Sequence, residues 1–226
     1  MQFYEQLLAE TEQNRSYLLQ APIIEDVMNK KFTMETYIAF LNQAYHHVKH
    51  TIPLLMTAGA KLSDDRESLR EVIAEYIKEE IGHEQWILND IESCGYSREE
   101  YRLGAAPFTS EVMVAYLFDY ITRKNPVGIF GMVLVLEGTS ADLAPTVAGI
   151  VKEELSLSDE ATTYLVSHGE LDQDHIQFFE KAMNTITDPD DRKAISDVAN
   201  AVYRLYGDVY RSIPAAAAAL LNQKAA

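Results

Sequence analysis

Cysteine, glycine and proline are scarce in this chain of 226 residues, and each scarcity excludes a class of protein. Ten glycines and seven prolines exclude a collagen-like or low-complexity chain, and the single cysteine, Cys94, can form neither an internal disulfide nor a thiolate zinc cluster. Basic residues are also few, because 19 Lys and Arg against 35 Asp and Glu give a formal charge of −16. A field of that sign repels phosphate backbones and anionic lipid headgroups, so we expect neither nucleic acid nor a membrane as a partner.

Long apolar runs and an export signal are missing as well. The longest apolar run, residues 127–136, is far shorter than the roughly 20 residues that span a bilayer. The first residues, MQFYEQLLAETEQNR, carry acidic side chains where a signal peptide has a basic region and an apolar run. We therefore expect a soluble, cytoplasmic protein. With 47% hydrophobic and 24% charged residues, the composition is typical of one globular domain over residues 1–226.

Apolar residues recur at spacings of three and four along the chain, which predicts an all-α protein. The sequence shows neither the alternation of a strand nor a linker that divides domains. The expected helices cover residues 3–20, 33–53, 66–93, 110–124, 127–144, 159–183 and 188–212, with a short helix after Ser97. Thr33 is an expected N-cap, and Ser97 opens a capping-box sequence. Because residues 127–136 are apolar all round, we expect their helix at the centre of one multi-helix bundle.

The most specific polar pattern is His168, Asp172 and His175, within SHGELDQDHIQFF. At about 100° per residue these three side chains project from one stripe of a helix, beside Leu165 and Phe178. Burying imidazoles and a carboxylate without partners costs several kcal/mol, and a bound metal would satisfy them. The alternative is a solvated acidic face, because other acids cluster in the same segment.

Two further helices carry candidate ligands. The stretch KEEIGHE places Glu80 and His83 three residues apart, the spacing of the inward-facing Glu-x-x-His unit of di-iron carboxylate bundles, although such pairs also occur on exposed helices. Glu79 and Glu84 are expected to be ordinary solvated acids. Glu137 follows nine uncharged residues, and a lone carboxylate in such a stretch is paired, protonated or metal-bound.

The segment QAYHHVKH adds three histidines. The apolar stripe through Ala44 and Leu54 places His47 on the inside and puts His46 and His50 together on a flank. His47 is therefore the candidate ligand of this helix, and the alternative is a core histidine hydrogen-bonded to a tyrosine.

Thirteen tyrosines are present, and most buried tyrosines pack in cores. Tyr116, Tyr120 and Tyr164 are the candidates for contact with a substrate.

Together the candidates form an oxygen- and nitrogen-rich set from four helices: Glu80, His83, Glu137, His168, Asp172, His175 and, optionally, His47. Such a set suits iron or manganese, whereas closed zinc sites do not need so many carboxylates. With these motifs the sequence resembles the heme-oxygenase-like superfamily and, within it, the iron-containing redox enzymes, also called heme-oxygenase-like di-iron oxidases. The resemblance covers nearly the whole chain, through the helix order, the EExxH stretch, LEGTS around Glu137 and the final HxxxDxxH.

The resemblance implies a heme-oxygenase-like bundle with iron as its cofactor, in one or two copies. Every candidate except Glu80 and His47 matches a family ligand, and Glu80 matches a glutamate whose spacing varies. Family members usually supply a further glutamate from the second helix, where this chain has His47, so the second metal site is altered or weak. The implied activity is that of an oxidoreductase that activates O2 to oxidise a small organic substrate, and the implied assembly is a homodimer.

The same superfamily offers other functions. TenA-type thiamine-salvage hydrolases look similar in QAYHHVK, but their pyrimidine-binding aspartate aligns with Ala44, and Cys94 lies in a predicted turn rather than in the core. True heme oxygenases use a proximal histidine on the first helix, and no histidine precedes His46. A cofactorless oxidase similar to the PQQ-synthesis enzyme and a non-catalytic binding protein stay open as alternatives.

Overall fold

The computed structural model describes the backbone of residues 1–224 and the side chains of residues 1–167 and 175–223. Within this range all regular structure is helical and no strand occurs, which confirms the all-α prediction. The helices are α1 (Phe3–Leu19), α2 (Pro22–Met28), α3 (Met34–Val48), α4 (Thr51–Lys61), α5 (Glu67–Glu80), α6 (His83–Ser93), α7 (Arg98–Leu103), α8 (Phe108–Arg123), α9 (Ile129–Glu154), α10 (Thr163–Thr185) and α11 (Pro189–Lys224). Three short 3₁₀ turns connect them, at Asp64–Arg66, Pro126–Gly128 and Asp159–Ala161.

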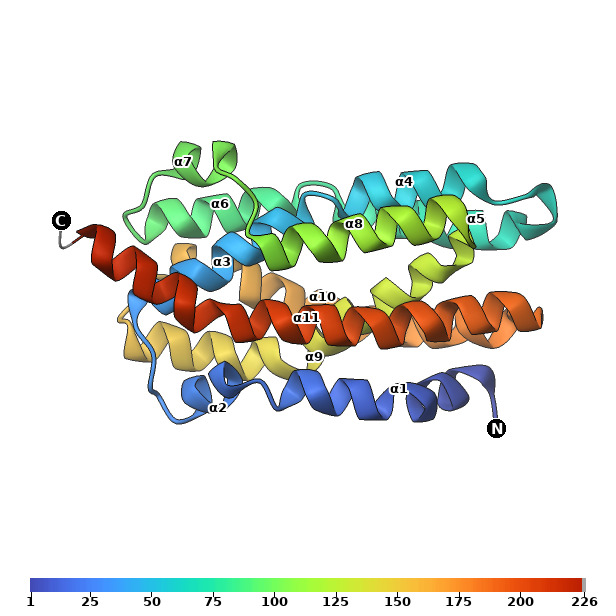
Figure 1. Ribbon diagram of the computed structural model, residues 1–226, viewed down its shortest axis with the longest axis horizontal. Helices are drawn as coiled ribbons and strands as arrows, with labels where there is room; N and C mark the ends of the chain where they lie inside the picture. Colours follow the sequence, from blue (N-terminus) through green and yellow to red (C-terminus); the bar gives the residue numbers. More distant parts are fainter. Residues whose placement is uncertain (225–226) are drawn as a thin grey trace.

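The helices form an elongated bundle whose long axis follows α11 (Figure 1). The helix α11 runs nearly the full length of the molecule and packs against α1, α3, α8 and α9. The helices α1 and α2 lie along one side of α11, and α3 to α8 lie along the other (Figure 1). The two ends of the chain lie at opposite ends of the bundle (Figure 1). This arrangement brings α9 and α10, which carry most of the candidate ligands, side by side in the interior.

The helix α9 is the central helix, as its uniformly apolar start predicts. Every residue from Ile129 to Val135 is buried. A Cβ atom on Gly131 would lie 2.5 Å from the backbone oxygen of Ile195, so only glycine allows α9 and α11 to approach this closely. The span Pro126–Glu154 is long and apolar enough to cross a membrane by length and composition alone, but 61% of its most apolar window is buried inside the bundle. The apolarity of α9 is thus that of a core helix.

Two predicted helix starts are confirmed. The Thr33 hydroxyl accepts a hydrogen bond from the Thr36 backbone N–H at 3.4 Å, and α3 begins at the next residue. The Ser97 hydroxyl accepts one from the Glu100 backbone N–H at 3.4 Å at the start of α7. Both caps satisfy a donor that the first turn of a helix leaves without an intrahelical partner.

The prediction of one helix over residues 66–93 is wrong in one respect. The chain breaks at Ile81–Gly82 into α5 and α6, and Gly82 has a φ of 94°. That left-handed conformation is open to glycine and ends the helical path. A similar joint at Lys49–His50 separates α3 from α4, so that the expected helix over residues 33–53 ends at Val48.

Two elements differ from expectation at the prolines. Pro22 does not only end the first helix but begins α2, where its fixed φ suits the first helical position. The helix α11 continues through Pro214 to Lys224 instead of stopping near Ser212. Its continuation buries Ile213 and Ala217 against Ala21 and Ile23, and this burial favours the helix despite the hydrogen bond lost at the proline.

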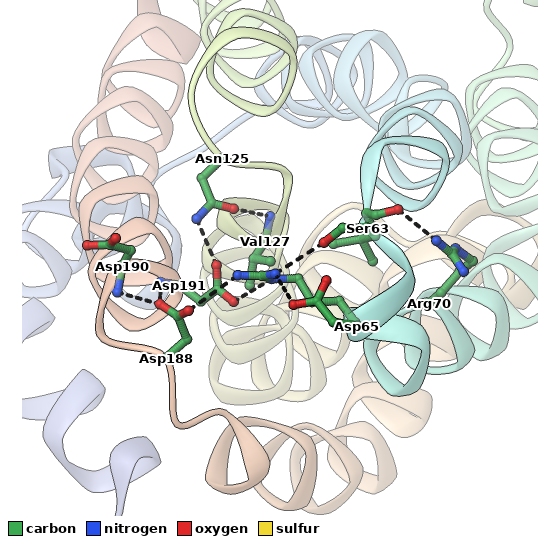
Figure 2. Close-up of polar contacts among 10 residues, drawn as sticks. Ser63, Asp65, Arg70, Asn125, Val127, Asp188, Asp190 and Asp191 are labelled. Carbon is green, nitrogen blue, oxygen red and sulfur yellow. Dashed lines mark hydrogen bonds and ion pairs between the residues drawn. The ribbon is translucent and has the colours of Figure 1, made fainter.

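A polar network closes the end of the bundle where α11 begins (Figure 2). The buried Asp191 carboxylate accepts hydrogen bonds from Arg66 Nε at 2.8 Å and from Asn125 Nδ2 at 2.9 Å. The Asn125 side-chain oxygen in turn accepts from the Val127 backbone N–H at 2.9 Å. The network therefore ties the starts of α5, α9 and α11 together through one carboxylate.

Candidate metal centre

The turn between α5 and α6 positions the first pair of candidate ligands. Glu80 is the last residue of α5 and His83 the first residue of α6, and both side chains are buried. His83 Nδ1 lies 3.1 Å from Glu80 Oε2. The break at Gly82 does not separate the pair, so the expectation that Glu80 and His83 meet is confirmed although they share no helix.

An aromatic ring packs against this pair. The indole of Trp86 stacks on the His83 imidazole with ring centroids 4.1 Å apart and an interplanar angle of 24°. Trp86 is the single tryptophan of the chain. Its emission therefore reports directly on the surroundings of His83.

The helix α10 brings His175 to the same region. This buried imidazole places Nε2 2.8 Å from Glu79 Oε2 and Nδ1 3.7 Å from Glu137 Oε1. The ring of Tyr76 packs edge-on against it with centroids 5.9 Å apart. The expectation that Glu79 is an ordinary solvated acid is wrong, because its carboxylate is two-thirds covered and paired with His175. Nothing in the sequence indicates this pairing, because Glu79 lies on α5 and its partner on α10.

Glu137 follows the apolar start of α9 and faces the interior. Its side chain is 13% exposed and lines a small space with His47, Glu80 and Tyr76, which we call the site pocket. The rest of the pocket wall is mostly apolar and aromatic and comes from α3, α4, α9, α10 and α11, with two hydroxyl side chains, Thr51 and Ser140. The carboxylates of Glu80 and Glu137 thus meet one enclosed space from two different helices.

The two adjacent histidines of α3 are both buried, which corrects the expectation that His46 lies on a flank. His47 lines the site pocket and packs edge-on against Tyr206 with centroids 5.4 Å apart. His46 Nδ1 lies 3.0 Å from Lys49 Nζ, and burial with the nearby lysine charge lowers the pKa of His46 to about 4. His46 is thus a neutral core imidazole, whereas His47 reaches the candidate ligands.

A buried aspartate that sequence reasoning missed sets the position of α10. Asp90 of α6 accepts hydrogen bonds from the backbone N–H groups of Thr163 and Tyr164, at 3.1 and 2.9 Å, and from the Thr163 hydroxyl. Burial raises the pKa of Asp90 to about 6, partly offset by these hydrogen bonds. Asp90 thereby joins the helix that begins with His83 to the helix that carries His175.

The three candidate tyrosines divide into two groups. Tyr164 lines the site pocket. Tyr116 and Tyr120 lie on α8 with ring centroids 5.9 Å apart, and the Tyr120 hydroxyl donates to Asp197 Oδ2 at 3.5 Å. Burial and Asp197 raise the pKa of Tyr120 to about 12. Among the described residues, neither α8 tyrosine contributes to the pocket wall.

Cys94 lies at the end of α6, as the predicted turn requires. Burial, with a smaller contribution from Asp90, raises the pKa of this thiol to about 11. A thiol that stays protonated at neutral pH is a poor nucleophile, which does not favour the chemistry of the thiamine-salvage hydrolases.

The structure thus brings Glu80, His83, Glu137 and His175 to one region together with Glu79. His168 and Asp172 lie on α10, but their side chains are outside the described residues. Among the side chains that are described, no three His, Cys, Asp or Glu already form a metal-binding cluster. The donors nonetheless fit iron in their chemistry, because buried carboxylates and imidazoles are the ligands that it takes in di-iron bundles. The His175–Glu79 contact matches the usual arrangement in which a ligating histidine donates its other N–H to a carboxylate.

Solved structures resemble the whole bundle. A domain of unknown function with a heme oxygenase-like fold, from Shewanella denitrificans, superposes with a TM-score of 0.87 at 21% identity, over 100% of this chain and 97% of its own. A TenA homologue from P. horikoshii superposes at 0.77 with 9% identity, over 96% and 100%. Heme oxygenase-1 from Synechocystis, in complex with heme, superposes at 0.75 with 12% identity, over 100% and 98%. Identities this low show the fold alone, which is heme-oxygenase-like.

Sequence comparisons identify the family to which the chain belongs. A search of curated proteins found no significant match. A family model described as iron-containing redox enzyme matches residues 38–207, which include every candidate ligand. The chain therefore belongs to the family of iron-containing redox enzymes within the heme-oxygenase-like fold.

Proposed function

We propose that this protein is a non-heme iron oxidoreductase that uses O2 to oxidise a small organic substrate. One observation carries the proposal: carboxylates and imidazoles from α5, α6, α9 and α10 converge on one buried region that adjoins an enclosed pocket. Buried charges of this kind are costly unless they are paired or hold a metal. Manganese has the same ligand preferences and is the alternative ion.

Some of these residues would bind the iron directly, and others orient the side chains that bind it. Glu80, His83, Glu137 and His175 would bind iron, completed by His168 and Asp172 on α10. Bound iron would supply electrons to O2 and open coordination positions for O2 and substrate. Glu79 orients His175 through its contact with Nε2 and favours the tautomer with its proton on that nitrogen.

Apolar side chains form part of the pocket wall, among them Leu55, Met132 and Val133, and the Tyr76 ring packs edge-on against His175. Apolar surroundings strengthen the interactions of the carboxylates with any cation inside the pocket. Asp90 holds α10 in register with α6, so the ligands of both helices keep their relative positions.

Anaerobic titration of the metal-free protein with Fe(II) tests the proposal. Trp86 emission should be quenched as iron binds, because the indole stacks on His83, and elemental analysis should give one or two irons per chain. His175→Ala should weaken binding by about tenfold or more, a loss typical of a removed ligand or its partner. His50→Ala is the matched control. His50 lies at the start of α4 and packs against Phe118, so its removal should leave iron binding unchanged.

The titration also decides the role of His47. If His47 serves a second ion, His47→Ala should lower the count from two irons to one, and His47→Glu should strengthen the second site by adding a charged oxygen ligand. A wild-type protein that binds neither Fe(II) nor Mn(II) in excess would overturn the metal proposal and favour a cofactorless or non-catalytic protein. Unchanged iron affinity in His175→Ala would show that the ligands lie elsewhere.

A further inference from the structure

An apolar chamber lies beside the site pocket. Residues of α2, α3, α9, α10 and α11 line it, and its wall includes Val27, Val147 and Ile213. The other described wall residues are also mostly aliphatic or aromatic, and the polar ones carry hydroxyl groups. Pockets of this composition bind the apolar body of a small molecule, and a few polar groups fix its orientation.

The chamber and the site pocket are neighbours along one face of α9. Ser140, Tyr164 and Tyr206 line both spaces. Glu137 lines the pocket one helical turn before Ser140, and the chamber wall continues along the same helix to Val151. A molecule that fills the chamber therefore presents one end to the candidate metal centre.

Five aromatic rings form one continuous part of the chamber wall, which we call the aromatic wall. The Phe40 ring packs against three tyrosine rings with centroids 6.3–6.4 Å apart, those of Tyr37, Tyr164 and Tyr210. The Tyr210 ring in turn packs edge-on against Tyr206 with centroids 5.0 Å apart. All five residues line the chamber, from α3, α10 and α11. An aromatic ligand can pack edge-on or offset-stacked against such rings, which adds attraction beyond the burial of apolar area.

The described chamber wall carries no charged side chain. An ionised ligand would lose its hydration in the chamber without meeting a counter-charge there, which is unfavourable. The carboxylates of the adjoining site pocket do not supply that counter-charge, because Glu80 faces His83 and Glu137 faces His175 as candidate iron ligands. Hydroxyl groups in the wall suit a neutral hydrogen-bonding group instead.

We propose that the chamber binds an uncharged aromatic molecule whose ring packs against the aromatic wall. Burial from water holds the body of the molecule, and contact with the Phe40 and tyrosine rings selects an aromatic ring over a saturated one. As a statement about the substrate this inference rests on the proposed oxidation. As a statement about binding it holds for the metal-free protein and is tested there.

Calorimetric titration of the metal-free full-length protein at pH 7 compares four probes of similar size: 3-phenylpropan-1-ol, its saturated analogue 3-cyclohexylpropan-1-ol, 3-phenylpropanoate and 3-phenylpropan-1-amine. The phenyl alcohol should bind about tenfold or more tightly than either ionised probe. It should also bind at least as tightly as the cyclohexyl alcohol, although the saturated ring is the more apolar one.

Each result decides one part of the proposal. An ionised probe that binds as tightly as the phenyl alcohol would overturn the assignment of an uncharged ligand. Tighter binding of the cyclohexyl alcohol would overturn the assignment of an aromatic one, and no binding of any probe would overturn the chamber as a binding site.

A matched pair of variants locates the ring of the probe. Phe40 and Phe118 are both half-buried, and the chamber is lined by Phe40 but not by Phe118. Phe40→Leu keeps an apolar side chain and should lower the affinity ratio of the phenyl to the cyclohexyl alcohol by roughly threefold, whereas Phe118→Leu should leave it unchanged. The ratio cancels the difference in hydration between the two probes. An unchanged ratio in Phe40→Leu would place the ring elsewhere and overturn the proposal.

The comparison of the four probes in the wild-type protein stands even if a variant fails to fold, which circular dichroism checks. Quenching of Trp86 by iron is measured separately. Probe binding without iron binding would retain the chamber as a site and overturn the proposed oxidation, whereas iron binding without probe binding would overturn the chamber alone. Failure of this inference and failure of the proposed function are thus distinguishable.

Discussion

The two halves of α9 have different surroundings although they belong to one helix. The packed half, Ile129–Val135, is buried at every residue and touches α11 so closely that Gly131 has no room for a Cβ atom. The chamber half, Thr139–Val151, faces the apolar chamber and includes Pro145, which lacks a backbone donor. Glu137 lies between the two halves. Close packing thus ends where the candidate site begins.

The two halves are also held by different interactions. The packed half lies within the main apolar core, to which α11 also contributes. Beside the chamber, buried hydrogen bonds to backbone groups fix the neighbouring helix, since Asp90 caps α10 and the Tyr37 hydroxyl donates to the Ala161 carbonyl at 2.9 Å. A bundle can therefore keep a pocket beside the candidate site if polar contacts replace part of the packing.

Substitution of a glycine in each half should give the largest contrast. Gly131→Ala should lower the free energy of unfolding by about 3 kcal/mol or more, because its Cβ would meet the Ile195 backbone, which cannot move without shifting α11. Gly149→Ala should raise it by about 0.5–1 kcal/mol, since no atom lies within 4 Å of that Cβ. Urea unfolding measures both. Similar losses in both variants would contradict the open space at the Gly149 Cβ position.

Removal of the α10 cap should have the next largest effect. Asp90→Ala leaves the Thr163 and Tyr164 backbone donors without their acceptor and should cost about 2 kcal/mol of unfolding free energy at pH 7. Fe(II) affinity should fall as well, because α10 loses its register with α6. A variant with wild-type stability would show that polar contacts do not hold this half.

The pH dependence of stability tests the role of Asp90 independently. The folded-state pKa of Asp90, about 6, lies above the ordinary value of 3.8, so the folded protein binds this proton more readily than the unfolded chain. The part of the stability that is linked to this proton is therefore present at acidic pH and is lost as pH rises from about 4 to 6, by at most about 3 kcal/mol, whereas the hydrogen bonds to the carboxylate remain. Asp90→Asn cannot titrate, so the advantage of wild type over Asp90→Asn should shrink across this range. An advantage that grows with pH would contradict the direction of the pKa shift.

The smallest effect is expected at Cys94, which is partly buried and packs against the core. Cys94→Ala should change the unfolding free energy by less than about 1 kcal/mol, because the side chain is half-buried and small. Turnover should be unchanged, because the raised pKa keeps the thiol protonated. Loss of turnover in this variant would revive the thiamine-hydrolase interpretation.

Local patterns in the sequence predicted much of the fold. The apolar run before Glu137 identified the central helix, and Thr33 and Ser97 marked helix starts, because these signals depend on neighbouring residues alone. The break at Gly82 was not predicted, since a single glycine inside a helical pattern is often tolerated. The pairing of Glu79 with His175 was not predicted either, because its partner lies on α10, far away in the sequence.

Local sequence patterns could not predict the chamber or the hydrogen bonds of Asp90 to the start of α10. The partners of Asp90 lie on another helix, and Asp90 and Tyr164 are 74 residues apart in the sequence. The burial of His46 likewise depends on how α3 packs in the bundle, which a local pattern does not give. The chamber needs side chains from five helices, among them α2, which the sequence pattern did not reveal. The ligand roles of Glu80, His83, Glu137 and His175 stay predictions, although the structure brings these four residues to one region.

The contrast along α9 also bears on how this fold can diversify. Residues that line a pocket make fewer contacts with other side chains than residues of the packed half, so we expect many substitutions there to change what the pocket accepts without unfolding the bundle. Structures that share 9–12% of their residues with this chain superpose on it with TM-scores of 0.75 and 0.77, so the bundle tolerates wide change in sequence. One bundle can thereby be inherited with its shape intact while its ligand changes.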